Sequence, residues 1–219
     1  MRLVVCIVAT VVSIVPCHTL TAQTAVRATT GTLPRVFDAS VPRARQVQLA
    51  MSAAPPEVAR HATIYVLTNQ GYEKDRAGSN GFTCLVARSF VKPTETTVEP
   101  MCFDAEGTRT LVPVRLRIEE WRAEGKSDAA ISASVAQGYK DGTFKAPTKI
   151  GVLYMLSSEN RLVPATGGDV ASIPPHLMFY APYMRARDFG YDSATTVPLL
   201  IEPGEPDAML VVLLPGITM

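Results

Sequence analysis

The sequence predicts an α+β fold: a single domain with a mainly antiparallel sheet, an N-terminal helix and a central pair of helices. Two observations indicate this class. The strand-like segments precede and follow the helical ones instead of alternating with them. No internal repeat or domain-splitting linker interrupts residues 40–219. A chain of this length, 47% apolar, is sufficient for one well-buried core.

The first residues have the pattern of a secretory signal peptide. Arg2 supplies a positive start, residues 3–15 form an uncharged apolar run, and Pro16 ends it. This run is shorter than the roughly 20 residues that a membrane-spanning helix needs. We therefore expect residues 1–22 to be a signal peptide, residues 23–39 a flexible lead-in, and the product to be exported to the periplasm or the medium.

Cleavage after Ala22 fits this pattern best, and cleavage after Ala28 comes second. The alternatives are an uncleaved N-terminal anchor and a lipid attached to Cys17. Removal of residues 1–22 takes away one of 21 basic residues and leaves 20 against 20 acidic ones. A neutral mature chain has no electrostatic footprint for nucleic acid. No further segment is apolar for long enough to span a bilayer.

The first helix is expected between Ser40, which can cap it, and Pro55, which ends it. Its apolar face combines Val47, Ala50, Met51 and Ala54. Residues 62–68 then form a strand by their Ile, Tyr and Val content. Residues 72–76 are mostly charged, and we expect them to stay exposed between two turns.

The central helices show the clearest periodicity. The first has an apolar stripe of Leu111, Val114, Ile118 and Trp121. We expect its opposite face to be wet, with Glu119, Glu120, Arg122 and Glu124. Ser127 can cap the second helix, whose buried stripe comprises Ile131, Val135 and Tyr139. The strands expected after these helices are residues 150–156, 177–181, 197–201 and 209–214, the last two as an antiparallel pair.

Cys84 and Cys102 are the two cysteines that remain after signal cleavage. Both have extended flanks, with a predicted loop over residues 92–97 between them. An even pair in an oxidising compartment predicts a disulfide, worth about 3 kcal/mol for a loop of this size. The alternative, a reactive or metal-binding thiol pair, lacks the Cys-x-x-Cys spacing.

Four motifs occur in a fixed order along the chain: Asn80–Cys84 (NGFTC), Pro100–Asp104 (PMCFD), Ile150–Leu156 (IGVLYML) and Pro175–Met178 (PHLM). The ordered set resembles an uncharacterised family of exported bacterial proteins, from about residue 60 to the C-terminus. The resemblance implies membership of that family. It carries no activity and no catalytic residue.

Two residues are candidates for catalysis. His176 stands at a strand entrance, where an imidazole can act as a general base or metal ligand. Asp104 could orient His176 or bind a substrate hydroxyl, which would make the protein a small hydrolase-like enzyme. The structural interpretations, which we favour, are a histidine bonded to a backbone carbonyl and an aspartate that caps the next helix or turn. Hydrolase and phosphate-loop signatures are absent from the sequence.

Weaker candidates for ligand binding are Asn80, Tyr154 and Tyr180. Four methionines, Met101, Met155, Met178 and Met184, suggest with His176 a Cu(I) site, because thioether and imidazole ligands suit this ion. They form no Met-x-x-Met motif, and we expect no metal or cofactor. We favour a domain that binds a small molecule or an envelope protein, ahead of the enzyme and the Cu(I) protein.

Overall fold

The computed structural model describes residues 37–88, 95–164, 169–190 and 199–214. All of them belong to one structural unit, Thr32–Met219. The predicted signal peptide and nearly all of the lead-in lie outside the described residues. Within the described ranges, no helix has both the length and the apolar character needed to cross a membrane.

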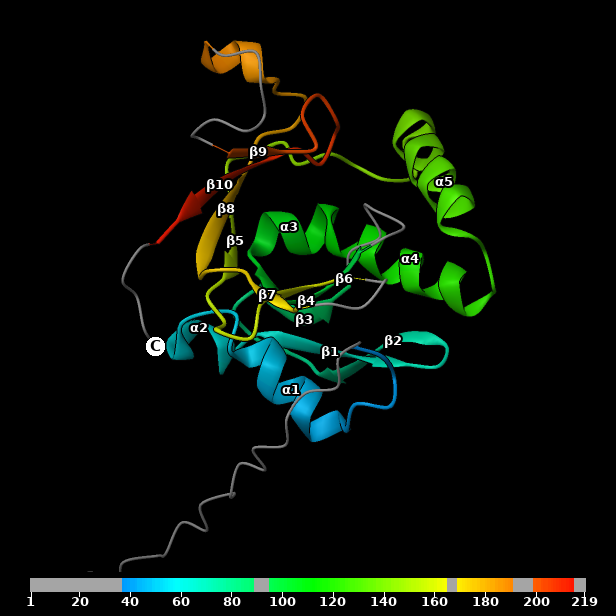
Figure 1. Ribbon diagram of the computed structural model, residues 1–219, viewed down its shortest axis with the longest axis vertical. Helices are drawn as coiled ribbons and strands as arrows, with labels where there is room; N and C mark the ends of the chain where they lie inside the picture. The colour runs from blue at the N-terminus through cyan, green and yellow to red at the C-terminus, as the bar shows by residue number, and fades with distance from the viewer. Residues whose placement is uncertain (1–36, 89–94, 165–168, 191–198, 215–219) are drawn as a thin grey trace, which may run out of the picture. The chain divides into compact units, whose positions relative to one another are not determined.

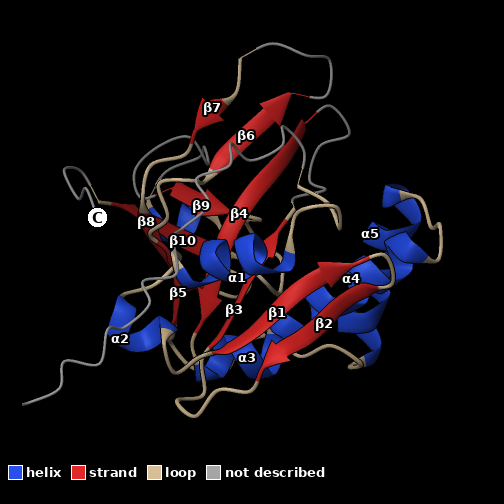
Figure 2. Ribbon diagram, turned by 90° about the horizontal axis from the view of Figure 1, so that it is seen from below, coloured by secondary structure: helices blue, strands red, loops and turns tan. Residues whose placement is uncertain are grey.

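A ten-stranded mixed sheet organises the domain (Figure 1; Figure 2). Its main path has the order β2-β1-β3-β4-β5-β8-β10-β9, and β6 and β7 branch from β4. Only the pairing of β1 with β3 is parallel among the described strands. The strands are β1 (Thr63–Thr68), β2 (Gly71–Arg76), β3 (Thr83–Ala87), β4 (Glu95–Phe103), β5 (Val152–Met155), β6 (Arg161–Pro164), β7 (Ala171–Ser172), β8 (His176–Tyr180), β9 (Leu199–Ile201) and β10 (Met209–Leu213). The predicted α+β class and mainly antiparallel sheet are confirmed.

The helices cover the sheet from two sides, with α1 and α3–α4 on opposite faces of β1, β3 and β4 (Figure 1). They are α1 (Arg43–Met51), α2 (Pro56–Ala59), α3 (Ala105–Thr110), α4 (Val112–Ala123) and α5 (Asp128–Asp141), with a 3-10 turn η1 (Ala186–Phe189). Successive strand residues point to opposite faces, so each strand contributes to two cores. The α1 core includes Leu49, Ile64, Cys84, Val86 and Cys102. The α3–α4 core includes Leu85, Phe103, Leu111, Val112 and Leu153.

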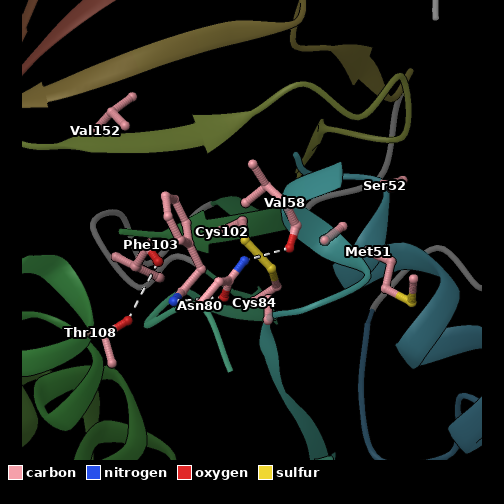
Figure 3. The surroundings of a disulfide bond; sticks show 12 residues. Met51, Ser52, Val58, Asn80, Cys84, Cys102, Phe103, Thr108 and Val152 are labelled. Atoms are coloured by element: carbon pink, nitrogen blue, oxygen red, sulfur yellow. Dashed lines mark hydrogen bonds between the residues drawn. A yellow bond between two sulfur atoms is a disulfide. The ribbon is translucent and has the colours of Figure 1, made fainter. Parts of the chain in front are cut away.

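The expected disulfide is present, and it joins neighbouring strands. Cys84 of β3 lies directly opposite Cys102 of β4 in the antiparallel register, with a Cα–Cα distance of 4.0 Å. Figure 3 shows the bond together with Val58 of α2 and Met51 of α1. Part of the predicted loop between the cysteines lies outside the described residues, and residues 95–97 belong to β4.

Residues 72–76 stay at least partly exposed, as expected, but they also form the edge strand β2, which was not predicted. It pairs with β1 through a hairpin that opposes Thr68 and Gly71. Tyr72 is half-buried and donates its hydroxyl to the carbonyl oxygen of Val86 at 2.6 Å. Charged side chains are common on edge strands, where they oppose pairing with another chain.

The first helix begins later than predicted. Pro42 is its N-cap residue, and Ser40 instead donates its hydroxyl to Asp38. Of the predicted face, Ala50 and Ala54 are buried and Val47 and Met51 only partly so, while Gln46 and Leu49 are buried without having been predicted. Gln46 satisfies the backbone at this point, since its amide nitrogen donates to the carbonyl of Leu67 and its amide oxygen accepts the Leu67 N–H.

The apolar stripe predicted for α4 is buried as expected at all four positions. The expectation that Glu119 faces water was wrong, because its side chain is only 3% exposed. It forms ion pairs with Arg88 and Arg122, and this pairing makes its burial tolerable. In α5, the Ser127 hydroxyl accepts the N–H of Ala130 as predicted, but of the predicted stripe only Ile131 is fully buried.

In the described part of the chain, the strands after α5 match the predicted segments to within one or two residues, and β8 begins one residue earlier than expected. Ile150 lies before β5 and is 85% exposed, so the strand is shorter than its apolar run. The predicted antiparallel pairing of β9 with β10 is confirmed. The short strands β6 and β7 were not predicted, because Arg161–Pro164 and Ala171–Ser172 carry little periodic signal.

Candidate functional site

His176 lies at the start of β8 in a buried position, 3% exposed. Its Nδ1 is 2.7 Å from the carbonyl oxygen of Pro174. Since a carbonyl oxygen can only accept, Nδ1 carries the proton of this hydrogen bond. Burial lowers the pKa of His176, and the hydrogen bond to Pro174 only partly opposes this effect. The environment is that of a neutral structural histidine bonded to the backbone.

Asp104 is the N-cap of α3 and accepts three hydrogen bonds. One carboxylate oxygen accepts the Gly107 N–H at 2.9 Å and the Tyr180 hydroxyl at 3.0 Å, and the other accepts the Val152 N–H at 2.9 Å. These bonds tie α3 to β5 and β8. None of the hydrogen bonds of Asp104 or His176 joins the two residues. The geometry therefore gives a catalytic pair of His176 and Asp104 no support.

Tyr180, a candidate for ligand binding, is buried and donates its hydroxyl to Asp104. Burial and the negative charge of Asp104 raise its pKa. Two glycines allow this close packing, since a Cβ at Gly107 would lie 2.1 Å from the Tyr180 hydroxyl oxygen. A Cβ at Gly151 would lie 2.4 Å from a carboxylate oxygen of Asp104. These contacts hold the start of α3 against β5 and β8, which indicates a structural role for the cluster.

Asn80 and Tyr154 also have structural contacts. The side-chain amide of Asn80 donates to the carbonyl of Val58 at 2.8 Å, beside the disulfide (Figure 3). Its oxygen accepts the Phe82 N–H at 3.1 Å, which closes the turn before β3. Tyr154 packs on Phe82, with ring centroids 6.2 Å apart. None of the three predicted ligand-binding residues lines any of the cavities described below.

The methionines of the Cu(I) hypothesis are divided between different parts of the core. Met101 and Met155 are buried in the α3–α4 core, and Met178 packs against it. Met184 packs in a separate small cluster. The sheet register sets Met155 opposite His176. Among the described residues, no three or more His, Cys, Asp or Glu side chains gather as a metal site would require. These contacts favour a packing role for the methionines.

A different part of the molecule contains a polar cavity, which we call the α5–hairpin pocket. Its volume is about 360 Å³. It lies between α4, α5 and the turn that connects β9 to β10, which points toward α5 in Figure 1. The lining residues are Arg115, Ser132, Val135, Ala136, Tyr139, Glu202, Glu205, Pro206 and Asp207. A small recess of about 20 Å³ adjoins it and shares Arg115, Val135, Tyr139 and Asp207.

Two polar groups of this pocket have no partner in the described part of the chain. The Tyr139 hydroxyl oxygen is buried and makes no hydrogen bond. The guanidinium of Arg115 is half-buried and forms no ion pair within 4.0 Å and no hydrogen bond with any described residue. Buried polar groups in native proteins nearly always have a partner, so such a pair requires an explanation.

The β9–β10 turn gives the pocket its negative charge. Burial, followed by the charges of Asp207 and Glu205, raises the pKa of Glu202, while Arg115 opposes this shift. Burial and the nearby Asp207 also raise the pKa of Tyr139. Glu202 itself has a φ of 49°, the left-handed conformation that a non-glycine residue rarely adopts. The three carboxylates thus share the pocket with a single cation.

A second cavity of about 500 Å³ lies on the other side of the α4–α5 pair. Its charged residues already have partners. Arg117 pairs with Glu120 and Glu124 and lies 5.0 Å from the centre of the Trp121 ring. Asp141 accepts the Thr143 N–H at 3.0 Å. Since none of the buried unpartnered polar atoms of the described residues lines this groove, we consider the α5–hairpin pocket the better candidate site.

The fold and this pocket define an α+β domain with a cavity of mixed charge. Comparisons with protein families, with curated proteins and with solved structures found no match. The resemblance of the ordered motifs to exported bacterial proteins stays a prediction. Sequence reasoning missed the pocket residues, although the dense acidic turn Glu202–Asp207, with two prolines and a glycine, was a signal that could have drawn attention to it.

Proposed function

We propose that the chain is an exported domain that binds a small organic molecule in the α5–hairpin pocket. The observation that carries the proposal is the pair of unpartnered groups, the Tyr139 hydroxyl and the Arg115 guanidinium, in one cavity. Ligand pockets typically combine apolar walls with a few polar groups that fix orientation. Here Val135, Ala136 and Pro206 supply the apolar wall.

Export is supported by the N-terminal sequence and by the disulfide. A buried bond between Cys84 and Cys102 suits an oxidising compartment. Mass spectrometry of the protein from its native source tests this part. We expect a mature chain that begins at residue 23 or residue 29, with both cysteines bridged. A chain that retains Met1, found in the cytosol with free thiols, would contradict export.

The binding site is tested by blocking the pocket. Ala136 is exposed, lies on α5 and lines the pocket, whereas Ala133 is exposed on the same helix and lines neither cavity. An NMR fragment screen of the wild-type protein should give amide shifts clustered at residues 132–139 and 202–207. Ala136→Trp should abolish these shifts, and Ala133→Trp should preserve them.

The pocket proposal fails if no fragment perturbs these residues, or if Ala136→Trp binds as the wild-type protein does. Thermal unfolding of both tryptophan variants checks that each is folded. Ser132→Trp, a second exposed position that lines the pocket, provides an independent block if Ala136→Trp unfolds.

A further inference from the structure

We infer that the ligand of the α5–hairpin pocket is a small zwitterion, whose carboxylate binds Arg115 and whose ammonium group binds the acidic turn Glu202–Asp207. This inference rests on the proposed function and deepens it by naming the ligand class. Three features of the pocket lead to it: an isolated cation, an excess of negative charge, and a short apolar wall between them.

The isolated cation is Arg115. It projects from α4 into both the pocket and the adjoining recess, and more than 4.0 Å separates its nitrogens from every described carboxylate oxygen. Its charge is nevertheless felt by Glu202 and by the half-buried Glu99. A guanidinium presents a planar set of donors that matches a carboxylate in two parallel hydrogen bonds. The Tyr139 hydroxyl beside it can donate to the same group.

The excess negative charge comes from the turn. Glu202, Glu205 and Asp207 line the pocket, and Arg115 is the sole cation among its lining residues. Burial raises the pKa of Glu202 most, and the like charges of Asp207 and Glu205 raise it further. An ammonium group placed among them would supply the missing counter-charge.

A simple anion would pair with Arg115 but would be repelled by the carboxylates of the turn. A simple cation would pair with these carboxylates but would be repelled by Arg115. A molecule with both groups satisfies the two ends at once. The wall of Val135, Ala136 and Pro206 fits a short aliphatic spacer, and a volume of about 360 Å³ falls within the usual range for small-ligand sites.

The test uses ligands that differ only in charge and length. Isothermal titration with glycine, 4-aminobutanoate and 6-aminohexanoate is compared with n-butylamine, butanoate and butanamide. We expect at least one of the zwitterions to bind ten-fold or more tightly than each of the three singly charged or neutral probes. The length series covers the unknown spacing between the two charged groups of the ligand.

Two variants assign the ends. With Arg115→Gln, the zwitterion should bind no more tightly than n-butylamine. With the double variant Glu202→Gln/Asp207→Asn, it should bind no more tightly than butanoate. The matched control is Arg117→Gln, on the same helix but paired with Glu120 and outside this pocket, and it should leave all affinities unchanged.

The inference is overturned if butanamide binds as tightly as the best zwitterion, if none of the zwitterions binds, or if Arg115→Gln has no effect. Fragments that still bind the pocket in those cases would leave the proposed function intact. If Ala136→Trp does not prevent any fragment from binding, both proposals fail together.

Discussion

Reduction of the Cys84–Cys102 disulfide should lower the free energy of unfolding by about 3 kcal/mol. The two cysteines are separated by 18 positions and oppose each other in the β3–β4 register. Cross-linking a loop of this size lowers the conformational entropy of the unfolded chain, which raises the free energy of that state by about 3 kcal/mol at 25 °C. Because the strands are paired in register on either side of the bond, the folded state needs no rearrangement when the bond opens.

The measurement is urea unfolding of the same protein with and without reductant. With a slope of about 2–3 kcal/mol per molar urea, the midpoint should fall by about 1–1.5 M. The control is Cys84→Ala/Cys102→Ala, whose midpoint should not respond to reductant. A change below about 0.3 M in the wild-type protein, or an equal change in the control, would refute the argument.

Three further predictions concern buried polar contacts. Tyr180→Phe removes the hydrogen bond to Asp104 and should cost about 1.5 kcal/mol, whereas Tyr183→Phe, at a 60% exposed position, should cost almost nothing in urea unfolding. Glu119→Gln removes the buried carboxylate that Arg88 and Arg122 share and should cost about 3 kcal/mol, whereas Glu120→Gln, at an exposed ion pair, should cost well under about 1 kcal/mol. Burial lowers the pKa of His176 from 6.5, so on acidification the unfolded chain takes up this proton before the folded protein does. The free energy of unfolding should therefore fall as the pH drops below about 6.5. It should level off once the pH is below the pKa of His176 in the folded protein. His176→Gln should lack this component when unfolding is followed between about pH 8 and pH 4.

The parts of the fold that could be predicted are those with a local signal. The stripe on α4 repeats over three helical turns, and the Ser127 cap and the cysteine pair are defined by their own neighbours. The parts that could not be predicted depend on distant residues. Glu119 is buried because Arg88, far away in the sequence, pairs with it, and β2 is a strand because β1 offers it a partner despite its charges.

The same dependence on distant residues explains why the sequence did not indicate the α5–hairpin pocket. His176 and Asp104 attract attention by residue type, but each is occupied by contacts within the fold. The two unpartnered groups of the pocket, Arg115 and Tyr139, have no unusual residue type, and the turn of Glu202–Asp207 meets them only through the fold. A polar group whose bonding capacity is used inside the fold contributes stability, and one left open in a cavity is the better candidate for binding.

Tyr139→Phe separates these two roles. In the free protein the Tyr139 hydroxyl oxygen is buried without a partner, and an unsatisfied buried polar group costs about 1–3 kcal/mol. Its removal should therefore leave the free protein as stable as before or up to about 1 kcal/mol more stable, in contrast to Tyr180→Phe. The same change should weaken zwitterion binding in calorimetry, because the ligand carboxylate loses a donor. A variant that is clearly less stable than the wild-type protein, or that binds the ligand equally well, would mean that the hydroxyl stabilises the fold and does not bind the ligand.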